Sequence, residues 1–158
     1  MKIEDALHIC IQFNGQLLTG EKGLNRNVRS IEVMEVPEVD SWVREDLLVI
    51  TTFYAVQDNV EAQSRIIQTL IERKAAGMIV KLGRFIDSLP KEIVHLAKEE
   101  EFPIILLPKD VPYVEILDPL YIRLHQKKML DEGGMIWGDI DEASLPTIEA
   151  CLDLLASK

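Results

Sequence analysis

Three short polar runs each follow a strongly aliphatic segment, and their residue types could together bind a small ligand. The runs are Thr51-Thr52-Phe53-Tyr54, Lys81-Leu82-Gly83-Arg84 and Leu107-Pro108-Lys109-Asp110. Lysine and arginine suit carboxylates, phosphates and carbonyl-rich heterocycles, and a glycine lets a ligand or a helix approach the backbone closely. We therefore predict a ligand-binding site made of five residues: Thr51, Thr52, Lys81, Gly83 and Arg84.

A purely structural interpretation of the same residues is also open. A lysine at a strand end can reach water with its ammonium group, and a pair of threonines can simply end a strand. Lys81 and Arg84 could then hold this edge of the protein together by pairing with Asp87 or Asp110. The two interpretations differ in whether the cations of the folded protein are already paired with carboxylates.

The sequence contains no convincing catalytic or metal-binding set. His8, His95 and His125 lack the spacing of metal ligands, and Cys10 lies on the apolar face of an expected helix. Neither GxxxxGK[ST] nor GxGxxG is present, and no serine has the context of a nucleophile elbow. We expect a protein that is not an enzyme, with no metal and no cofactor.

The aliphatic segments in front of the polar runs are predicted to be buried parallel strands. Residues 47–50, 78–82 and 104–107 are continuous apolar runs of the kind that is covered on both faces of a sheet. Helical patterns with an apolar stripe follow them. The first should be capped at Asp58-Asn59 and closed by Gly77, and the last, from Tyr113 toward Lys128, contains Pro119, which should kink or delay it. This alternation implies right-handed crossovers, and the carboxyl ends of such strands are where ligands bind.

The predicted fold class is therefore α/β: a short, mostly parallel sheet with flanking helices, a βαβαβ core and a C-terminal helical appendage. Before this core, residues 3–13 have helical spacing, residues 20–27 are turn-forming, and residues 28–36 indicate a strand near an edge. We expect two parts, a domain over residues 1–128 and an acidic tail over residues 129–158. The tail has seven acidic residues against one lysine, and a short amphipathic helix is expected in it, with Leu145, Ile148, Leu152 and Leu155 on one face.

Net charge, cysteine content and hydropathy limit the kinds of partner and the cellular compartment that we expect for this protein. The net charge of −10 disfavours nucleic-acid binding by this chain, and two distant cysteines provide no disulfide framework. The sequence shows neither a leader nor an apolar run long enough to span a membrane, so we expect a cytoplasmic protein without a membrane partner.

Two long stretches resemble one family. Residues 17–55, "LLTGEKGLNRNVRSIEVMEVPEVDSWVREDLLVITTFYA", contain a Gly-Leu-Asn-Arg-x-Val turn, a proline-containing loop with Trp42 and a Thr-Thr strand end. Residues 75–116, "AAGMIVKLGRFIDSLPKEIVHLAKEEEFPIILLPKDVPYVEI", contain Lys-x-Gly-Arg and Leu-Pro…Pro-Tyr elements. Over roughly residues 1–128, this ordered set resembles the N-terminal sensory domain of PucR-type purine catabolism regulators.

The resemblance implies a regulatory domain of a bacterial transcription factor linked to purine, ureide or related nitrogen pathways. Such proteins usually carry a helix-turn-helix at the far C-terminus, whereas this sequence stops at Lys158 without a basic recognition helix. We therefore expect a short form or a fragment that does not bind DNA directly. The leading hypothesis is a module that binds an unidentified small-molecule effector and forms a homo-oligomer, such as a dimer. The alternative is a protein-interaction or dimerisation module without a small ligand, which uses the apolar stripes of residues 113–128 and 145–155.

Overall fold

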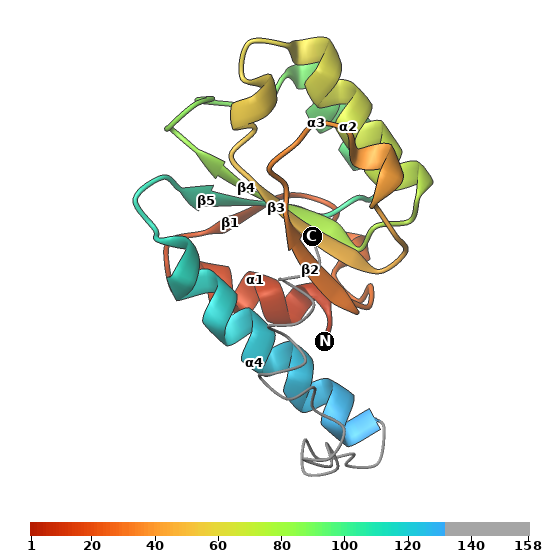
Figure 1. Cartoon of the computed structure of the whole chain (residues 1–158), viewed down its shortest axis with the longest axis vertical. Coiled ribbons are helices and arrows are strands. Elements are labelled where there is room, and N and C mark those ends of the chain that lie inside the picture. Colours follow the sequence, from red (N-terminus) through yellow and green to blue (C-terminus); the bar gives the residue numbers. More distant parts are fainter. Residues whose placement is uncertain (132–158) are drawn as a thin grey trace, which may run out of the picture. The chain divides into compact units, whose positions relative to one another are not determined.

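A five-stranded β-sheet forms the central layer of the protein (Figure 1). The computed structural model describes residues 1–131, with side chains through Lys127. The strand order is β1-β5-β4-β3-β2, in which β1 is antiparallel to β5 and all other neighbours are parallel. The strands are β1 (Gln16–Thr19), β2 (Ser30–Val33), β3 (Leu47–Thr51), β4 (Gly77–Leu82) and β5 (Ile104–Pro108). The predicted α/β class with a mostly parallel sheet is confirmed.

Helices cover both faces of this sheet (Figure 1). The α-helices are α1 (Ile3–Ile11), α2 (Val60–Glu72), α3 (Lys91–Glu99) and α4 (Tyr113–Asp131), and the 3-10 helices are η1 (Glu21–Gly23), η2 (Val39–Ser41) and η3 (Tyr54–Val56). The Asn59 side chain accepts a hydrogen bond of 2.9 Å from the N–H of Ala62, which caps α2 as its sequence predicts. Pro90 stands directly before α3, where a missing N–H costs nothing.

The two faces of the sheet bury two separate hydrophobic clusters. Val49, Met78 and Val80 point toward the side of α2 and α3, whereas Leu48, Ile50 and Ile79 point toward the side of α1 and α4. Residues of β3 and β4 are therefore buried on both faces, which explains why their sequences are continuous aliphatic runs instead of alternating ones. No helix within residues 1–131 has both the length and the apolar character needed to cross a membrane.

Three local details differ from the sequence-based expectation. Strand β1 is missed, because it has only four residues, contains an irregularity between Leu17 and Thr19, and is partly exposed. Helix α2 ends at Glu72 instead of continuing to Gly77; Lys74 supplies the turn with φ 57°, and Gly77 opens β4. Pro119 lies inside α4 and does not delay the start of that helix at Tyr113.

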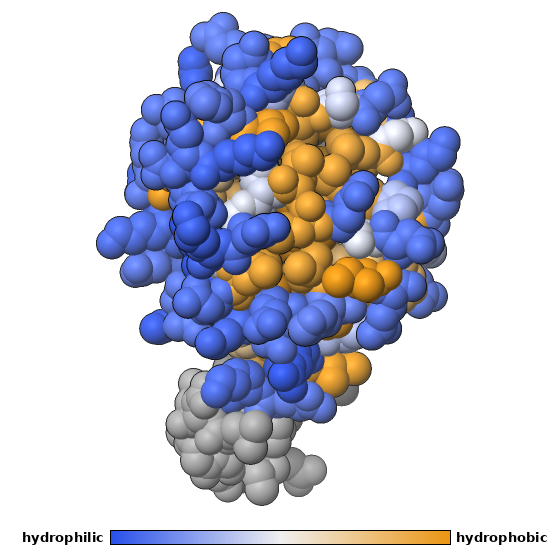
Figure 2. All heavy atoms as spheres, turned by 180° about the vertical axis from the view of Figure 1, so that it is seen from behind, coloured by the Kyte–Doolittle hydropathy of each residue, from blue (hydrophilic) through white to orange (hydrophobic). Residues whose placement is uncertain are grey.

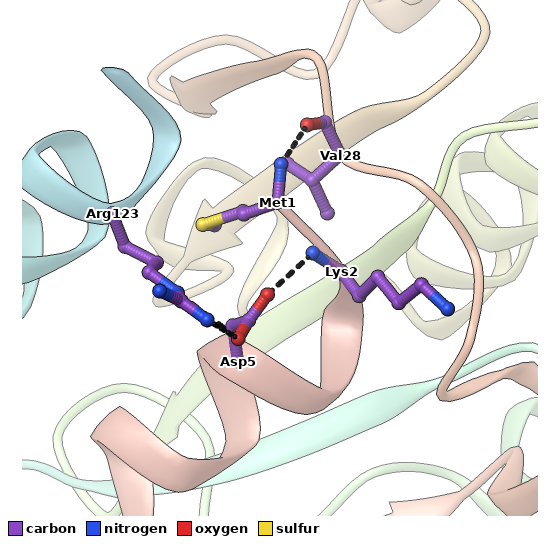
Figure 3. A network of polar contacts seen from close by, with 5 residues as sticks. All are labelled: Met1, Lys2, Asp5, Val28 and Arg123. Carbon is purple, nitrogen blue, oxygen red and sulfur yellow. Dashed lines mark hydrogen bonds and ion pairs between the residues drawn. The ribbon is translucent and has the colours of Figure 1, made fainter. Parts of the chain in front are cut away.

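The compact unit Met1–His125 includes most of α4, which an ion pair joins to α1 (Figure 3). The Arg123 guanidinium lies 2.8 Å from Asp5 Oδ1, and Asp5 Oδ2 accepts a hydrogen bond of 2.8 Å from the N–H of Lys2. Burial alone would raise the pKa of Asp5, but the Lys2 N–H and the Arg123 hydrogen bond and charge hold it below its ordinary value. The predicted boundary after residue 128 remains a prediction, and the expected helix with Leu145 to Leu155 lies outside the described residues.

Candidate ligand-binding site

A cavity of about 690 Å³ lies where β3, β4 and β5 end. All three polar runs contribute to its lining, and the end of β2 and the two residues after it add to the lining from the edge of the sheet. The charged lining residues are Glu35, Lys81, Arg84, Lys109 and Asp110, the aromatic ones are Tyr54, Phe85 and Tyr113, and the others are Val33, Met34, Thr52, Ala55, Val111 and Pro112. The position agrees with the rule that ligands of open parallel sheets bind at the carboxyl ends of the strands.

Lys81 is the most unusual lining residue, because only 5% of it is exposed. Its Nζ donates a hydrogen bond of 2.6 Å to the carbonyl of Val111 and lies 4.4 Å from the centroid of the Tyr113 ring. Burial lowers the pKa of Lys81, and the nearby Arg84 charge lowers it further, while Asp110 acts in the opposite direction. The ammonium is therefore held, partly desolvated, against the loop before α4 and the first residue of that helix.

The alternative interpretation, in which Lys81 and Arg84 pair with Asp87 or Asp110, is not borne out by direct contacts. None of the ion pairs within the described part of the chain includes Lys81 or Arg84. The Arg84 guanidinium instead lies 5.6 Å from the centroid of the Phe85 ring, with its side chain exposed. The partners of Lys81 are a carbonyl and an aromatic ring. Neither Lys81 nor Arg84 therefore has a carboxylate in direct contact.

The two neighbouring threonines have different surroundings. Thr52 and Tyr113 both line the cavity. Burial raises the pKa of Tyr113, whereas a hydrogen bond with the Thr52 side chain and the charge of Arg84 lower it. Thr51 is 1% exposed, and its Oγ1 accepts a hydrogen bond of 2.9 Å from the N–H of Phe53. This bond stabilises an uncommon turn, because Phe53 is buried and has a φ of 56°. Thr51 thus positions the chain after β3 and is absent from the cavity lining.

Gly83 has a conformational role in this structure. Its φ is +90°, and its N–H donates a hydrogen bond of 2.8 Å to the carbonyl of Ile86. An added Cβ would lie 3.6 Å from Lys109 Cδ, an ordinary contact, so it is the backbone conformation that favours glycine here. Of the five predicted site residues, the structure brings Thr52, Lys81 and Arg84 to the cavity, and direct ligand contact for any of the five stays a prediction.

The sequence analysis missed one buried residue that supports the cavity wall without lining the cavity. Gln63 of α2 is 2% exposed, and its Nε2 donates hydrogen bonds of 2.9 Å to the carbonyl of Val56 and 3.3 Å to that of Gln57. These bonds hold η3, whose Tyr54 and Ala55 line the cavity. Nothing in the sequence signals this role, since glutamine in a helix is ordinarily a solvent-exposed residue.

Within residues 1–127, the cysteine and histidine side chains outside the cavity show no arrangement typical of a catalytic or metal site. Cys10 is fully buried in the core, and burial raises its pKa to about 12. His95 lies 3.3 Å from Glu99, and His125 Nδ1 lies 2.7 Å from the carbonyl of Tyr121; both rings are exposed. Within residues 1–127 no three histidine, cysteine, aspartate or glutamate side chains gather as metal ligands would.

Residues 7–124 match the purine catabolism regulatory protein-like family, PucR. Over 118 residues the chain is 31% identical to the purine catabolism regulatory protein of Bacillus subtilis (strain 168), a match that covers 75% of this chain and 22% of that protein. The chain therefore spans about a fifth of the length of this curated relative.

Among solved structures, the CBS and DRTGG domains of the regulatory region of Clostridium perfringens pyrophosphatase, in complex with the activator diadenosine tetraphosphate, are similar. The TM-score is 0.48 and the sequence identity 19%, over 74% of this chain and 49% of that chain. The family assignment follows from the sequence matches, which extend over most of the sheet and its helices. This chain belongs to the purine catabolism regulatory protein-like family.

Proposed function

We propose that this chain is a cytoplasmic sensory domain of a bacterial transcription regulator. It binds a small polar metabolite of purine or related nitrogen catabolism in the cavity at the carboxyl ends of β3, β4 and β5. Binding then influences self-association of the domain. The observation that carries this proposal is the pair Lys81 and Arg84, two cations at one cavity that no carboxylate of the described chain neutralises by direct contact.

The size and chemistry of the cavity support a small ligand. Ligand sites commonly have volumes of roughly 300–1,000 Å³ and combine apolar walls with a few polar groups. Here the volume is about 690 Å³, and the lining contains both aromatic and charged side chains.

The start of α4 provides a route by which binding could be transmitted. Lys81 holds the Val111 carbonyl and the Tyr113 ring, and both residues also line the cavity. A ligand that attracts the Lys81 ammonium competes with these two contacts. Because a ligand can shift an equilibrium only through contacts that differ between two states, this competition is the difference that signalling requires.

A thermal-shift panel of ureides, purines, amino acids and phosphorylated metabolites tests the proposal. A ligand at about 100 times its dissociation constant should stabilise the protein by about 2.7 kcal/mol. The Lys81→Ala/Arg84→Ala double variant should lose this shift, whereas Arg44→Gln, which removes an exposed cation outside the cavity, should retain it. A ligand whose shift survives unchanged in the double variant would show that the site assignment is wrong.

A second candidate function is an interaction module without a small ligand, and exposed apolar residues favour it. The face of the protein opposite to the view of Figure 1 has apolar residues gathered in its middle and ringed by hydrophilic ones (Figure 2). Helix α4 also exposes Val114 and Ile122, at 56% and 59%. Apolar surface of this kind often marks a protein–protein contact.

Light scattering of the chain distinguishes this second candidate. Under it, the wild type is an oligomer without any ligand, and Ile122→Lys lowers the measured mass. Val60→Lys, at a similarly exposed apolar residue of α2, serves as the matched control and should leave the mass unchanged. A monomeric wild type would count against the interaction module.

A further inference from the structure

We propose that the cavity selects a small planar organic anion with a single negative charge and disfavours polyphosphates. This inference rests on the proposed function, because it names the chemical class of the ligand for that same site. It follows from three properties of the site: the balance of the lining charges, the use of two nearby backbone N–H groups within the protein, and the arrangement of the aromatic rings.

The charges of the lining suit one negative charge. Three cationic side chains, Lys81, Arg84 and Lys109, face two acidic ones, Glu35 and Asp110. The excess is a single positive charge, so a monoanion leaves the cavity near neutrality. A triphosphate would bring several negative charges close to the two carboxylates, and like charges at short range repel strongly.

Two backbone N–H groups beside the cavity are not available to a phosphate. Phosphate sites use free N–H groups of a glycine-rich turn or of successive backbone amides. The Gly83 N–H donates to the carbonyl of Ile86 at 2.8 Å, and the Phe53 N–H donates to Thr51 Oγ1 at 2.9 Å. Two amides at the ends of β4 and β3 are therefore already used within the protein.

The anionic group of the ligand is expected at Lys81 and Arg84. An ammonium has three donors; the Val111 carbonyl takes one, and the ring of Tyr113 faces the ammonium at 4.4 Å, which leaves donor capacity for a ligand. Because Lys81 is 95% buried by the surrounding protein, its attraction for an anion is less screened than that of a surface lysine. The Arg84 guanidinium can bind a planar carboxylate or an equivalent delocalised anion with two parallel hydrogen bonds.

The aromatic side chains favour a flat ligand. The rings of Tyr54 and Phe85 lie with their centroids 4.6 Å apart at 55°, and both line the cavity. The exposed fraction of Tyr54 is 62%, so this ring is accessible for stacking. Planar rings stack on aromatic faces and on the guanidinium plane, a geometry that flexible aliphatic acids cannot use.

Isothermal titration calorimetry of the whole chain with matched acids and neutral partners tests the inference. The pairs are nicotinate with nicotinamide and orotate with uracil, and ATP and pyrophosphate represent polyanions. At least one planar acid should bind about tenfold or more tightly than its neutral partner, a difference of about 1.4 kcal/mol. Arg84→Gln should abolish this preference, because it removes a cation that binds the anionic group of the ligand. Since Arg84 is exposed, this variant should still fold, and Arg44→Gln, at an exposed residue outside the cavity, should preserve the preference.

Each other outcome overturns the inference in a recognisable way. Equal binding of an acid and its neutral partner refutes the charge selectivity but leaves a ligand-sensing function in place. Tighter binding of ATP or pyrophosphate refutes the single-charge class. Absence of binding by both planar acids up to about 10 mM, which corresponds to less than about 3 kcal/mol of affinity, refutes the planar-anion class. Planar-acid binding that Arg84→Gln does not change refutes this site, and with it the proposed function.

Discussion

Replacing Gln63 by methionine should destabilise the protein, because the buried amide holds the turn that carries part of the cavity wall. Its Nε2 donates to the Val56 carbonyl at 2.9 Å in a buried setting and to the Gln57 carbonyl at 3.3 Å in a partly buried one. Methionine has a similar length and keeps the apolar contacts of the side chain, but it donates no hydrogen bond. The substitution therefore isolates the two hydrogen bonds from packing.

The structure sets the size of the expected loss. Leaving one buried carbonyl without a donor costs about 1–3 kcal/mol, and the longer bond to Gln57 contributes less. The apolar methionine recovers part of this on burial, so we expect a net loss of about 1–2 kcal/mol in the free energy of unfolding. Gln63→Glu should cost more, because a carboxylate at the same position would face the two carbonyl oxygens as an acceptor.

Urea unfolding followed by circular dichroism measures this loss, and a neighbouring residue supplies the control. Gln68 lies on the same helix, is exposed, and pairs only with Glu72 at 3.0 Å, so Gln68→Met should change stability by less than about 0.5 kcal/mol. The slope of unfolding free energy against urea should stay unchanged in both variants. A Gln63→Met protein as stable as Gln68→Met would refute the view that Gln63 anchors η3.

Three further predictions concern other parts of the protein. Gly83→Ala should cost about 1–2 kcal/mol in urea unfolding, because alanine is strained at φ +90° although its Cβ has room; a cost near zero would contradict this. Arg123→Gln should raise the pH of acid unfolding, since the lowered pKa of Asp5 gives stability that is present above the ordinary carboxyl pKa of about 3.9 and lost as the pH falls through the lowered pKa. An unchanged acid transition would show that the pair of Asp5 and Arg123 does not contribute. Cys10, buried and with its pKa raised to about 12, should resist iodoacetamide at pH 8 in folded Cys151→Ser protein and react once urea is added; fast labelling without urea would contradict its burial.

The parts of the fold that could be predicted are those where burial leaves a strong local pattern. Strands β3, β4 and β5 are covered on both faces, so each is a continuous aliphatic run that ends in polar residues. The edge strand β1 is short and irregular, and its existence depends on pairing with β5 about ninety residues later in the chain. Such a pairing leaves no signal within the strand itself.

The position of the cavity could be predicted from the sequence, but the contacts that its residues make could not. Lys81, Arg84 and Thr52 reach the cavity because their strands end at the same edge of the sheet, which follows from the parallel arrangement. Thr51 and Thr52 are neighbours of the same type, and only the turn at Phe53 decides that one hydroxyl is used internally. The Val111 carbonyl that binds Lys81 comes from a loop thirty residues later, which no local pattern indicates.

Nuclear magnetic resonance offers the most direct test of the claim that the carboxyl ends of β3, β4 and β5 bind a small anionic ligand. The ¹⁵N-labelled chain would be titrated with orotate and nicotinate, and the shifts of assigned backbone amides followed. We expect saturable changes confined to residues 52–55, 81–85 and 109–113, and their loss in Arg84→Gln. Saturable changes that instead centre on α2 and α3, or that persist unaltered in Arg84→Gln, would contradict a binding site at this edge of the sheet.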